Sequence, residues 1–224
     1  MSLWGYLRHS RIYQKYLEHS RLHCMFAWIV HPVLTVKHLL KVMSPNINRP
    51  GYWDGRYEKM NEWRTNVYEF IIPLLKKWET EGKFTLMDIG CGLGDGCIFV
   101  KSNFSQADVS GADLSPLAIN KANKRFPQGH FFQHDIVNDK LPNQYDYVLM
   151  VSILEHLEKP YQAVDNALAS VKKALIIHCP YKEVPIVEPD HYHYFVEDTL
   201  SRYRPDVSVL GGRIVYIIRP ERLE

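Results

Sequence analysis

Residues 90–96 carry glycine at every second position, and this spacing constrains the chain more than any other feature. They follow an apolar run that predicts a strand over residues 84–89. Without side chains, a backbone with this spacing can turn tightly and lie against a ligand. Asp113 stands 23 residues after Gly90, at the end of a second apolar run. Two strand ends, a glycine-rich turn and a carboxylate that can bind a ribose predict a nucleoside cofactor site.

Nicotinamide dinucleotides also bind after a glycine-rich first strand, but their spacing differs from the one seen here. Their fingerprint, G-x-G-x-x-G, needs its third glycine for close helix packing under a pyrophosphate. Counted from Gly90, that position is Asp95, and counted from Gly92 it is Cys97. A carboxylate there opposes the anion that a helix N-terminus binds. The sequence therefore favours a cofactor without a pyrophosphate.

Four stretches stand in a fixed order along the chain. They are Asp88-Ile-Gly-Cys-Gly-Leu-Gly, Gly111-Ala-Asp113-Leu-Ser115, Phe132-Gln-His-Asp135-Ile136, and a segment from Tyr145 to Leu157 in which Asp146 opens a strand and Glu155-His156 closes it. Together they resemble the motifs of the class I S-adenosylmethionine-dependent methyltransferases, over about residues 52–219. The resemblance implies S-adenosylmethionine as cofactor. It also implies an α/β fold: a Rossmann-like, seven-stranded, mostly parallel sheet with helices on both faces and its last strand antiparallel.

The resemblance also implies roles around the cofactor. Residues 90–96 lie under the methionine part with Asp88 beneath them, Asp113 accepts from both ribose hydroxyls, and Asp135 accepts from the adenine amino group. An aromatic segment at residues 52–57 resembles one that folds over the cofactor in this family. The predicted cofactor-binding residues are Trp53, Arg56, Asp88, Gly90, Cys91, Gly92, Gly94, Asp113, Leu114, Asp135, Ile136, Val151 and Ser152.

Hydrophobic periodicity predicts alternating strands and helices. Apolar residues from Met60 to Trp78 recur at steps of three or four, which predicts a helix that Pro73 kinks or splits. A further helix is predicted near residues 196–203. Gly211-Gly212, between two β-rich runs, predicts a tight hairpin with antiparallel strands. Strands are predicted at residues 84–89, 109–113, 130–133, 145–151, 174–179, 207–210 and 213–219. Such βα units indicate an open, mostly parallel sheet wrapped by helices.

Methyl transfer is an in-line displacement, so orientation of the two reactants supplies much of the catalysis. A general base is needed only where the acceptor must lose a proton. The candidates are His156, after the fourth strand, and His191 and His193, after the fifth. Glu155-His156 has the alternative role of capping a helix or lining the cofactor pocket.

A second resemblance concerns a metal site. Glu155-His156 together with the His-Tyr-His run at residues 191–193 faintly resembles the small-RNA terminal 2′-O-methyltransferases, a family in which two Glu and two His bind a divalent ion. In that pattern an acid stands three residues before the second Glu, where this chain has Ser152. With one ligand missing, no metal is predicted.

Residues 1–50 differ from the rest of the chain in charge, with seven Lys or Arg and one Glu, and they include several Trp and Tyr. We expect a basic helical arm or cap there, followed by a methyltransferase domain over residues 51–224. Such an arm can bind an anionic partner such as nucleic acid or a membrane surface. Packing of its aromatic side chains on the domain, with the charges solvated, is favoured.

The cysteines lie far apart and form no C-x-x-C motif (Cys24, Cys91, Cys97 and Cys179). Such spacing is typical of thiols in a reducing compartment, so a cytoplasmic protein is expected. The apolar stretch at residues 24–40 is too short and too polar to span a bilayer.

We therefore predict a methyltransferase that moves the methyl group of S-adenosylmethionine to an oxygen or nitrogen of a small-molecule acceptor. The alternatives are an RNA methyltransferase of the 2′-O-ribose type and a non-catalytic S-adenosylmethionine-binding protein. The segment after the fourth strand lacks the Asn-Pro-Pro-Tyr run of enzymes that methylate exocyclic amines of bases. Nucleic acid is therefore possible as a partner but not favoured.

Overall fold

The structure of the chain is a computed structural model that describes residues 48–62, 65–78, 82–183 and 191–223. The predicted N-terminal arm falls almost entirely on residues 1–47, outside the described residues. Among the helices that the structure describes, none combines the length and the hydrophobicity needed to cross a bilayer.

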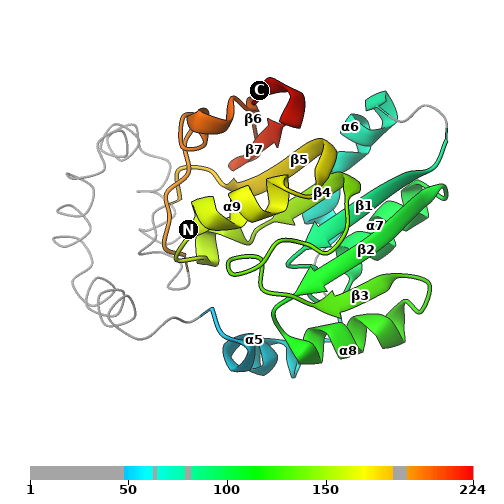
Figure 1. The fold of residues 1–224 in the computed structure, drawn as a ribbon. Coiled ribbons are helices and arrows are strands. Elements are labelled where there is room, and N and C mark those ends of the chain that lie inside the picture. Colours follow the sequence, from blue (N-terminus) through cyan, green and yellow to red (C-terminus); the bar gives the residue numbers. More distant parts are fainter. Residues whose placement is uncertain (1–47, 63–64, 79–81, 184–190, 224) are drawn as a thin grey trace, which may run out of the picture.

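A seven-stranded sheet forms the centre of the fold, with the strand order β3-β2-β1-β4-β5-β7-β6 (Figure 1). Its strands are β1 (Phe84–Ile89), β2 (Ala107–Asp113), β3 (His130–Gln133), β4 (Tyr145–Val151), β5 (Val171–Pro180), β6 (Asp206–Leu210) and β7 (Arg213–Ile218). The first five strands pair in parallel, and β7 runs antiparallel to both β5 and β6. The predicted mostly parallel sheet with one antiparallel strand is confirmed.

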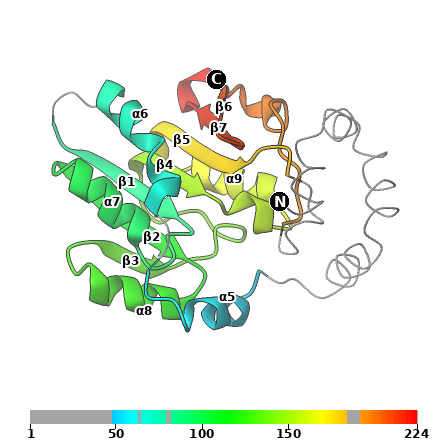
Figure 2. The ribbon, with the colours of Figure 1, turned by 180° about the vertical axis from the view of Figure 1, so that it is seen from behind.

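Helices cover both faces of this sheet. They are α5 (Pro50–Tyr57), α6 (Ile71–Trp78), α7 (Asp95–Asn103), α8 (Pro116–Arg125) and α9 (Pro160–Leu168), with the short 3₁₀ helices η1 (Thr65–Tyr68), η2 (Leu154–His156), η3 (Ser201–Tyr203) and η4 (Pro220–Arg222). Helix α9 lies in front of the sheet in Figure 1, and α6 and α7 lie in front of it in the reverse view of Figure 2.

Two hydrophobic cores result, because successive side chains of a strand point to opposite faces. Leu86 of β1 and Leu149 of β4 belong to the core under α6 and α7, whereas their neighbours Met87 and Met150 belong to the core under α9. All four side chains are fully buried. Strands buried on both faces read as continuous apolar runs, which is why the sequence located them.

Two predicted helices differ from the structure. The region from Met60 to Trp78 is not one helix: it contains η1, a turn and α6, and the break precedes Pro73 instead of falling on it. Pro73 is the third residue of α6, where its missing N–H would have no intrahelical partner. The predicted helix at residues 196–203 is wrong, since turns and η3 occupy it. Their hydrogen bonds span three residues, as from the N–H of Tyr203 to the carbonyl of Leu200.

The predicted hairpin is confirmed. Gly211 and Gly212 have φ angles of 55° and 78°, the left-handed conformations that a two-residue turn of type I′ requires at both positions. This hairpin returns the chain as β7 alongside β5, and it places Arg213 opposite Pro180.

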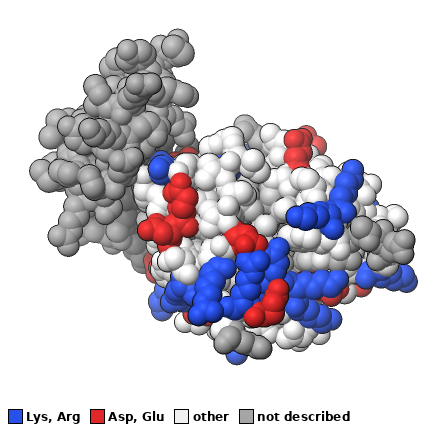
Figure 3. All heavy atoms as spheres, turned by 90° about the horizontal axis from the view of Figure 1, so that it is seen from above, with Lys and Arg blue, Asp and Glu red and all other residues white. Residues whose placement is uncertain are grey.

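Charged side chains of both signs are mixed on the face of the molecule shown in Figure 3. Ion pairs in the C-terminal part of the chain join Asp206 to Arg219 and Arg222, and Asp165 to Arg202. Exposed pairs of this kind contribute roughly 0–1 kcal/mol each to stability. Asp206 thereby links β6 to the segment that follows β7, and Asp165 links α9 to η3.

Candidate functional site

The glycine-rich loop joins the end of β1 to α7. The N–H groups of Gly90 and Cys91 both donate to the carbonyl of Ala112, so the loop is fastened to the end of β2. Gly90 has a φ of 73°, and a Cβ there would lie 2.2 Å from Cγ2 of Ile153. Any side chain at this position would therefore clash and strain the backbone. The loop presents bare backbone to the space above it.

Asp113 ends β2 beside this loop. Its carboxylate accepts from the N–H of Gly92 and from the N–H of Ser115, each at 2.9 Å. The side chain is buried, and burial raises its pKa to about 6 even though the two N–H donors oppose the shift. Each carboxylate oxygen has a second lone pair, so Asp113 can accept two further hydrogen bonds from a ligand.

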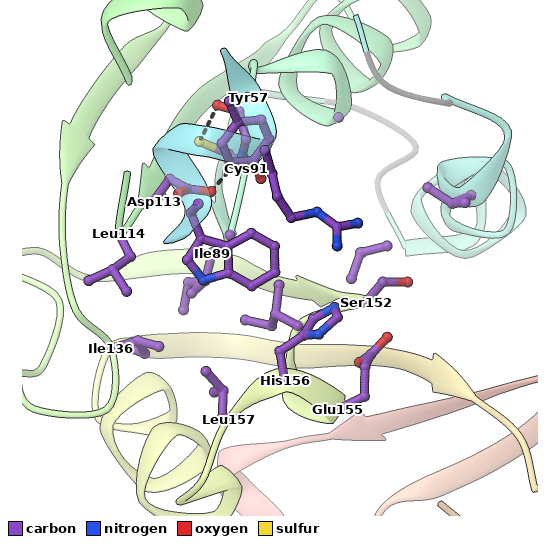
Figure 4. Close-up of a pocket in the computed structure, with 18 of the residues that line it drawn as sticks. Tyr57, Ile89, Cys91, Asp113, Leu114, Ile136, Ser152, Glu155, His156 and Leu157 are labelled. Carbon is purple, nitrogen blue, oxygen red and sulfur yellow. Dashed lines mark hydrogen bonds between the residues drawn. The ribbon is translucent and has the colours of Figure 1, made fainter. Parts of the chain in front are cut away.

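A cavity of about 750 Å³ opens in front of the loop and of Asp113 (Figure 4). Its wall includes the predicted residues Trp53, Arg56, Gly90, Cys91, Gly92, Asp113, Leu114, Asp135, Ile136, Val151, Ser152, His156 and His191. They come from the carboxyl ends of β1, β2 and β4 and the segments that follow β3 and β5, with α5 above them. An open parallel sheet binds its ligands at this edge.

Three predicted site residues do not line the cavity. Asp88 lies beneath the loop, fully buried, where it accepts a hydrogen bond of 2.9 Å from the hydroxyl of Tyr68. Burial raises the pKa of Asp88 to about 7. Gly94 is the N-cap of α7 and packs against Phe131. His193 is not part of the cavity lining, and its Nε2 is hydrogen-bonded to the backbone carbonyl of Leu157.

Asp135 and Ile136 line the cavity from the segment that follows β3. The carboxylate of Asp135 accepts from the N–H of Val137 at 3.0 Å and from the side-chain amide of Asn138 at 2.8 Å. Ile136 is buried and presents an apolar side chain next to it. A fixed acceptor beside an apolar surface suits the edge and the face of a purine ring.

Helix α5 closes the cavity from above and is anchored to α8. Lys121 donates to the carbonyls of Tyr57 and Met60 at 2.8 and 2.7 Å. Asp54 accepts from the hydroxyl of Ser115 and from the N–H of Leu117. The two contacts hold the predicted aromatic segment over the glycine loop.

Aromatic rings of α5 form the roof. A Cβ on Gly92 would lie 3.0 Å from the hydroxyl of Tyr57, so Tyr57 stands directly over the loop. Trp53 meets the ring of His156 edge-on, with 5.1 Å between the ring centroids, and the guanidinium of Arg56 lies 5.9 Å from the Trp53 ring. The roof therefore joins the loop to the far end of the cavity.

The far end of the cavity contains one carboxylate and two imidazoles, those of Glu155, His156 and His191. Figure 4 shows Glu155 and His156 opposite Asp113. Glu155 is 1% exposed, and burial raises its pKa to about 7. The ring centroids of His156 and His191 are 4.8 Å apart. Nδ1 of His191 is hydrogen-bonded to the carboxylate of Glu183.

The backbone between β4 and η2 is strained at Ser152, which lines the cavity. Ser152 has a φ of 55°, unusual for a residue with a side chain, and its N–H donates to the carbonyl of His178 at 2.8 Å. Strain of this kind clusters at ligand sites, where the fold holds it in place. It directs the chain from the end of β4 along the cavity wall.

The sequence does not single out two residues of this far end, Glu183 and Arg213, because neither belongs to a motif. Glu155 is expected from the sequence together with His156, as a cap, as part of the cofactor or acceptor pocket, or in the metal-binding pattern. Arg213 lines the cavity only because β7 pairs with β5. The spacing of residues along the chain does not reveal the order of the strands in the sheet, so the sequence gives no signal that Arg213 lines the cavity.

Comparisons with known proteins agree with the fold and the loop. Residues 87–175 match a family model described as a methyltransferase domain. The mitochondrial ubiquinone biosynthesis O-methyltransferase of Schizosaccharomyces pombe is 24% identical over 129 residues, which is 54% of this chain and 46% of that protein. Trans-aconitate 2-methyltransferase of Escherichia coli K12 is 24% identical over 111 residues, 46% of this chain and 44% of that protein. The chain thus spans about half the length of the curated relatives it matches.

Solved structures show the same fold. Magnesium protoporphyrin IX methyltransferase from Synechocystis, with bound SAH, superposes with a TM-score of 0.59 at 15% identity, covering 80% of this chain and 98% of that one. A SAM-dependent methyltransferase from Aquifex aeolicus gives 0.57 at 16% identity, covering 73% and 96%. Residues 87–175 thus match a methyltransferase domain, and the strand order and the glycine loop agree with the fold of the class I S-adenosylmethionine-dependent methyltransferases. The cofactor of that class is S-adenosylmethionine.

Proposed function

We propose that this protein transfers the methyl group of S-adenosylmethionine to an oxygen or nitrogen atom of a small-molecule acceptor. The observation that carries the proposal is one continuous cavity that runs from Asp113 and Asp135 to Glu155 and His191. A donor and its acceptor must share one enclosed space, because the nucleophile has to approach to about 3 Å from the methyl carbon. The names of the two curated relatives refer to ubiquinone biosynthesis and trans-aconitate, which supports a small molecule as acceptor.

The residues of the cavity fit this cofactor. Asp113 offers two carboxylate oxygens to vicinal ribose hydroxyls, and Asp135 with Ile136 offers an acceptor and an apolar face to adenine. The glycine loop leaves room for the methionine part, and Arg56 lies within the lining to pair with its carboxylate. When bound, the cofactor supplies a methyl carbon made electrophilic by a positively charged sulfur.

The pyrophosphate of a dinucleotide fits less well. Asp95 at the start of α7 forms a two-bond ion pair with Arg125, with N–O distances of 2.7 and 3.0 Å. This pair occupies the first turn of α7, where a pyrophosphate would otherwise bind to helix N–H groups. The arrangement supports a cofactor without phosphates, as the sequence predicts.

The roof of the cavity orients the reactants and excludes water. Trp53 and Tyr57 present ring faces and edges above the loop, where a sulfonium gains cation–π attraction. Lys121 and Asp54 keep α5 in place without entering the cavity. Exclusion of water strengthens each electrostatic contact inside the cavity.

An acceptor that loses its proton on methylation needs a group to receive it. His191 is better placed for this role than His193, because it lines the cavity and its ring is held by Glu183. A carboxylate on one ring nitrogen stabilises the imidazolium that forms when the other takes a proton. Burial lowers the pKa of His193, and its Nε2 bonds to a backbone carbonyl. His156 is the second imidazole within reach.

The proposal is tested with methyl-labelled S-adenosylmethionine and the full chain. Small-molecule extracts and RNA are offered as separate acceptor pools, and labelled products are separated and identified by mass spectrometry. We expect label in a small molecule, at oxygen or nitrogen. Label confined to RNA would favour the RNA alternative. Tight cofactor binding with no labelled product in any pool would favour the non-catalytic alternative.

A further inference from the structure

We propose that Glu155, His156 and His191 bind a divalent transition-metal ion at the acceptor end of the cavity. Each of the three residues offers one ligand atom, and these atoms all lie within 4.8 Å of one another. One carboxylate oxygen with two imidazole nitrogens is a donor set that binds Zn²⁺ and other first-row divalent ions. The predicted absence of a metal rested on Ser152, but this cluster does not use that position.

Glu155 gives the first independent support. It is 1% exposed, and its Oε2 accepts no hydrogen bond from any residue that the structure describes. Leaving a buried carboxylate oxygen without a partner costs free energy. Since Glu155 lines the cavity, a ligand there can supply the missing partner. Arg213 lines the same end, and its positive charge disfavours a cation, so the three ligands must outweigh it.

The segment that carries His191 is held in place before any ion binds. The N–H of Tyr192 donates to the carbonyl of Glu155 at 2.7 Å, which fastens this segment to η2. The carboxylate of Glu183 fixes the ring of His191 through Nδ1. In metal-binding histidines, the ring nitrogen that does not bind the metal commonly donates a hydrogen bond to a carboxylate. This bond sets the orientation of the ring and raises the basicity of the nitrogen that binds the metal. Glu183 is therefore a positioning residue for the proposed site.

The geometry needs only a small closure. Ligand atoms around one ion, with bonds of about 2.0–2.2 Å, lie roughly 3–4 Å apart. The three side chains must then draw together by about 1 Å, within the reach of small rotations about side-chain bonds. Three protein ligands leave at least one coordination position open toward the cavity.

The open position gives the ion a role, and this part of the inference rests on the proposed function. An acceptor hydroxyl that binds there loses its proton more readily, because the ion stabilises the oxyanion. With both imidazoles bound to the ion, they no longer act as bases: the proton of the acceptor hydroxyl passes to solvent water as the hydroxyl binds the ion, and the anionic oxygen then takes the methyl group. Acceptors with an oxygen donor suited to a divalent ion are thereby favoured.

Metal binding is measured on the full chain after treatment with a chelator. Zn²⁺ is titrated by calorimetry, and Co²⁺ by its visible absorption, which reports coordination by nitrogen and oxygen. Glu155→Gln and His191→Asn remove single ligands. His130→Asn is the matched control, because His130 is exposed at the start of β3. The control also accounts for histidines in residues 1–47, which all variants share.

We expect one site whose Co²⁺ absorption and Zn²⁺ affinity fall at least tenfold in Glu155→Gln and in His191→Asn, but not in His130→Asn. S-Adenosylmethionine binding in the same variants reports whether they are folded and whether the proposed function stands. Equal metal binding in all variants, or none in the unmodified chain, would overturn the metal site. Failure of the unmodified chain to bind S-adenosylmethionine would overturn the proposed function instead, whatever the metal does.

Discussion

The carboxylate of Asp113 accepts a hydrogen bond from the backbone N–H of Gly92, with 2.9 Å between the nitrogen and the oxygen. This bond ties the end of β2 to the glycine loop after β1, and it sets the acid beside the loop at the mouth of the cavity. The same contact explains why an acid at the end of β2 and glycines after β1 are needed together: one holds the other in the conformation that can receive a nucleoside.

Replacing Asp113 tests the ribose contact. Asp113→Ala removes a charge-assisted, two-bond contact worth about 2 kcal/mol, so S-adenosylmethionine should bind at least tenfold more weakly. Calorimetric titration measures this affinity. Asp108→Ala is the control, because Asp108 is an exposed residue of the same strand, and its affinity should match that of the unmodified protein. Equal affinity in both variants would place the ribose elsewhere.

Replacing Gly90 tests the need for a bare backbone. Gly90→Ala puts a Cβ into the side chain of Ile153 at a φ of 73°, so we expect a loss of stability of about 1–3 kcal/mol and weaker cofactor binding. Gly55→Ala is the contrast, since Gly55 lies in α5 with open space around it. There alanine should leave stability unchanged or raise it by about 0.5–1 kcal/mol. Thermal and urea denaturation measure the stability of both variants. Equal stability of Gly90→Ala and the unmodified protein would contradict the prediction.

Buried acids give the free protein a characteristic pH dependence. Burial raises the pKa of Asp88 to about 7, far above its ordinary value of 3.8. Because the folded-state pKa is the higher one, the stabilising contribution of the protonated carboxyl is complete below about pH 4 and is lost as the pH rises to about 7. Asp113 and Glu155, with pKa values of about 6 and 7, act in the same direction.

Asp88→Asn should therefore flatten the fall in unfolding free energy between pH 5 and pH 8, by up to roughly 3 kcal/mol. Asp146→Asn is the control of opposite sign: burial raises the pKa of Asp146, but hydrogen bonds from Thr85 and the charges of Lys172 and Lys173 together lower it below its ordinary value. Its contribution is present above about pH 4 and lost on further acidification, so the fall from pH 5 to 8 should persist in that variant. Urea unfolding at a series of pH values gives the comparison, and identical curves for Asp88→Asn and the unmodified protein would contradict it.

Loosening α5 tests its role as a roof. Lys121→Met removes the ammonium that binds carbonyls of Tyr57, Glu58 and Met60. The core should stay intact while the cofactor dissociates several-fold faster, since α5 covers the cavity but adds little to the sheet. Stopped-flow measurement of cofactor release checks this. Lys124→Met, on the exposed side of α8, should leave the rate unchanged; equal rates in all three proteins would mean that α5 does not retain the cofactor.

Much of the fold and half of the site could be predicted from the sequence, for a physical reason. The central strands are buried on both faces, so they appear in the sequence as apolar runs. Gly211-Gly212 predicts a tight turn, because few other residue pairs adopt the positive φ angles that it requires. Most of the cofactor end lies within short motifs, because the glycine loop, Asp113 and Asp135 stand at or just after the ends of strands. Local spacing is enough to place such residues at one edge of a parallel sheet.

The acceptor end could be predicted only in part, as a pocket formed by the N-terminal arm, the Glu155-His156 turn and residues 180–195. Glu155, His191 and Arg213 come from three separate segments, and they meet only because the strand order is β4-β5-β7. His191 and His193 look alike in sequence, but one lines the cavity and the other bonds to a backbone carbonyl. The helix predicted at residues 196–203 fails for a local reason. The hydroxyl of Thr199 accepts a hydrogen bond from the N–H of Val196, and this contact favours a turn over a helix.

A crystal structure of the full chain with S-adenosylmethionine or S-adenosylhomocysteine tests the central claim most directly. The account predicts a nucleoside whose ribose hydroxyls bind Asp113, whose adenine lies by Asp135 and Ile136, and whose sulfur points toward His156 and His191. A cavity that stays empty in the presence of saturating cofactor, or a ribose bound away from Asp113, would contradict it.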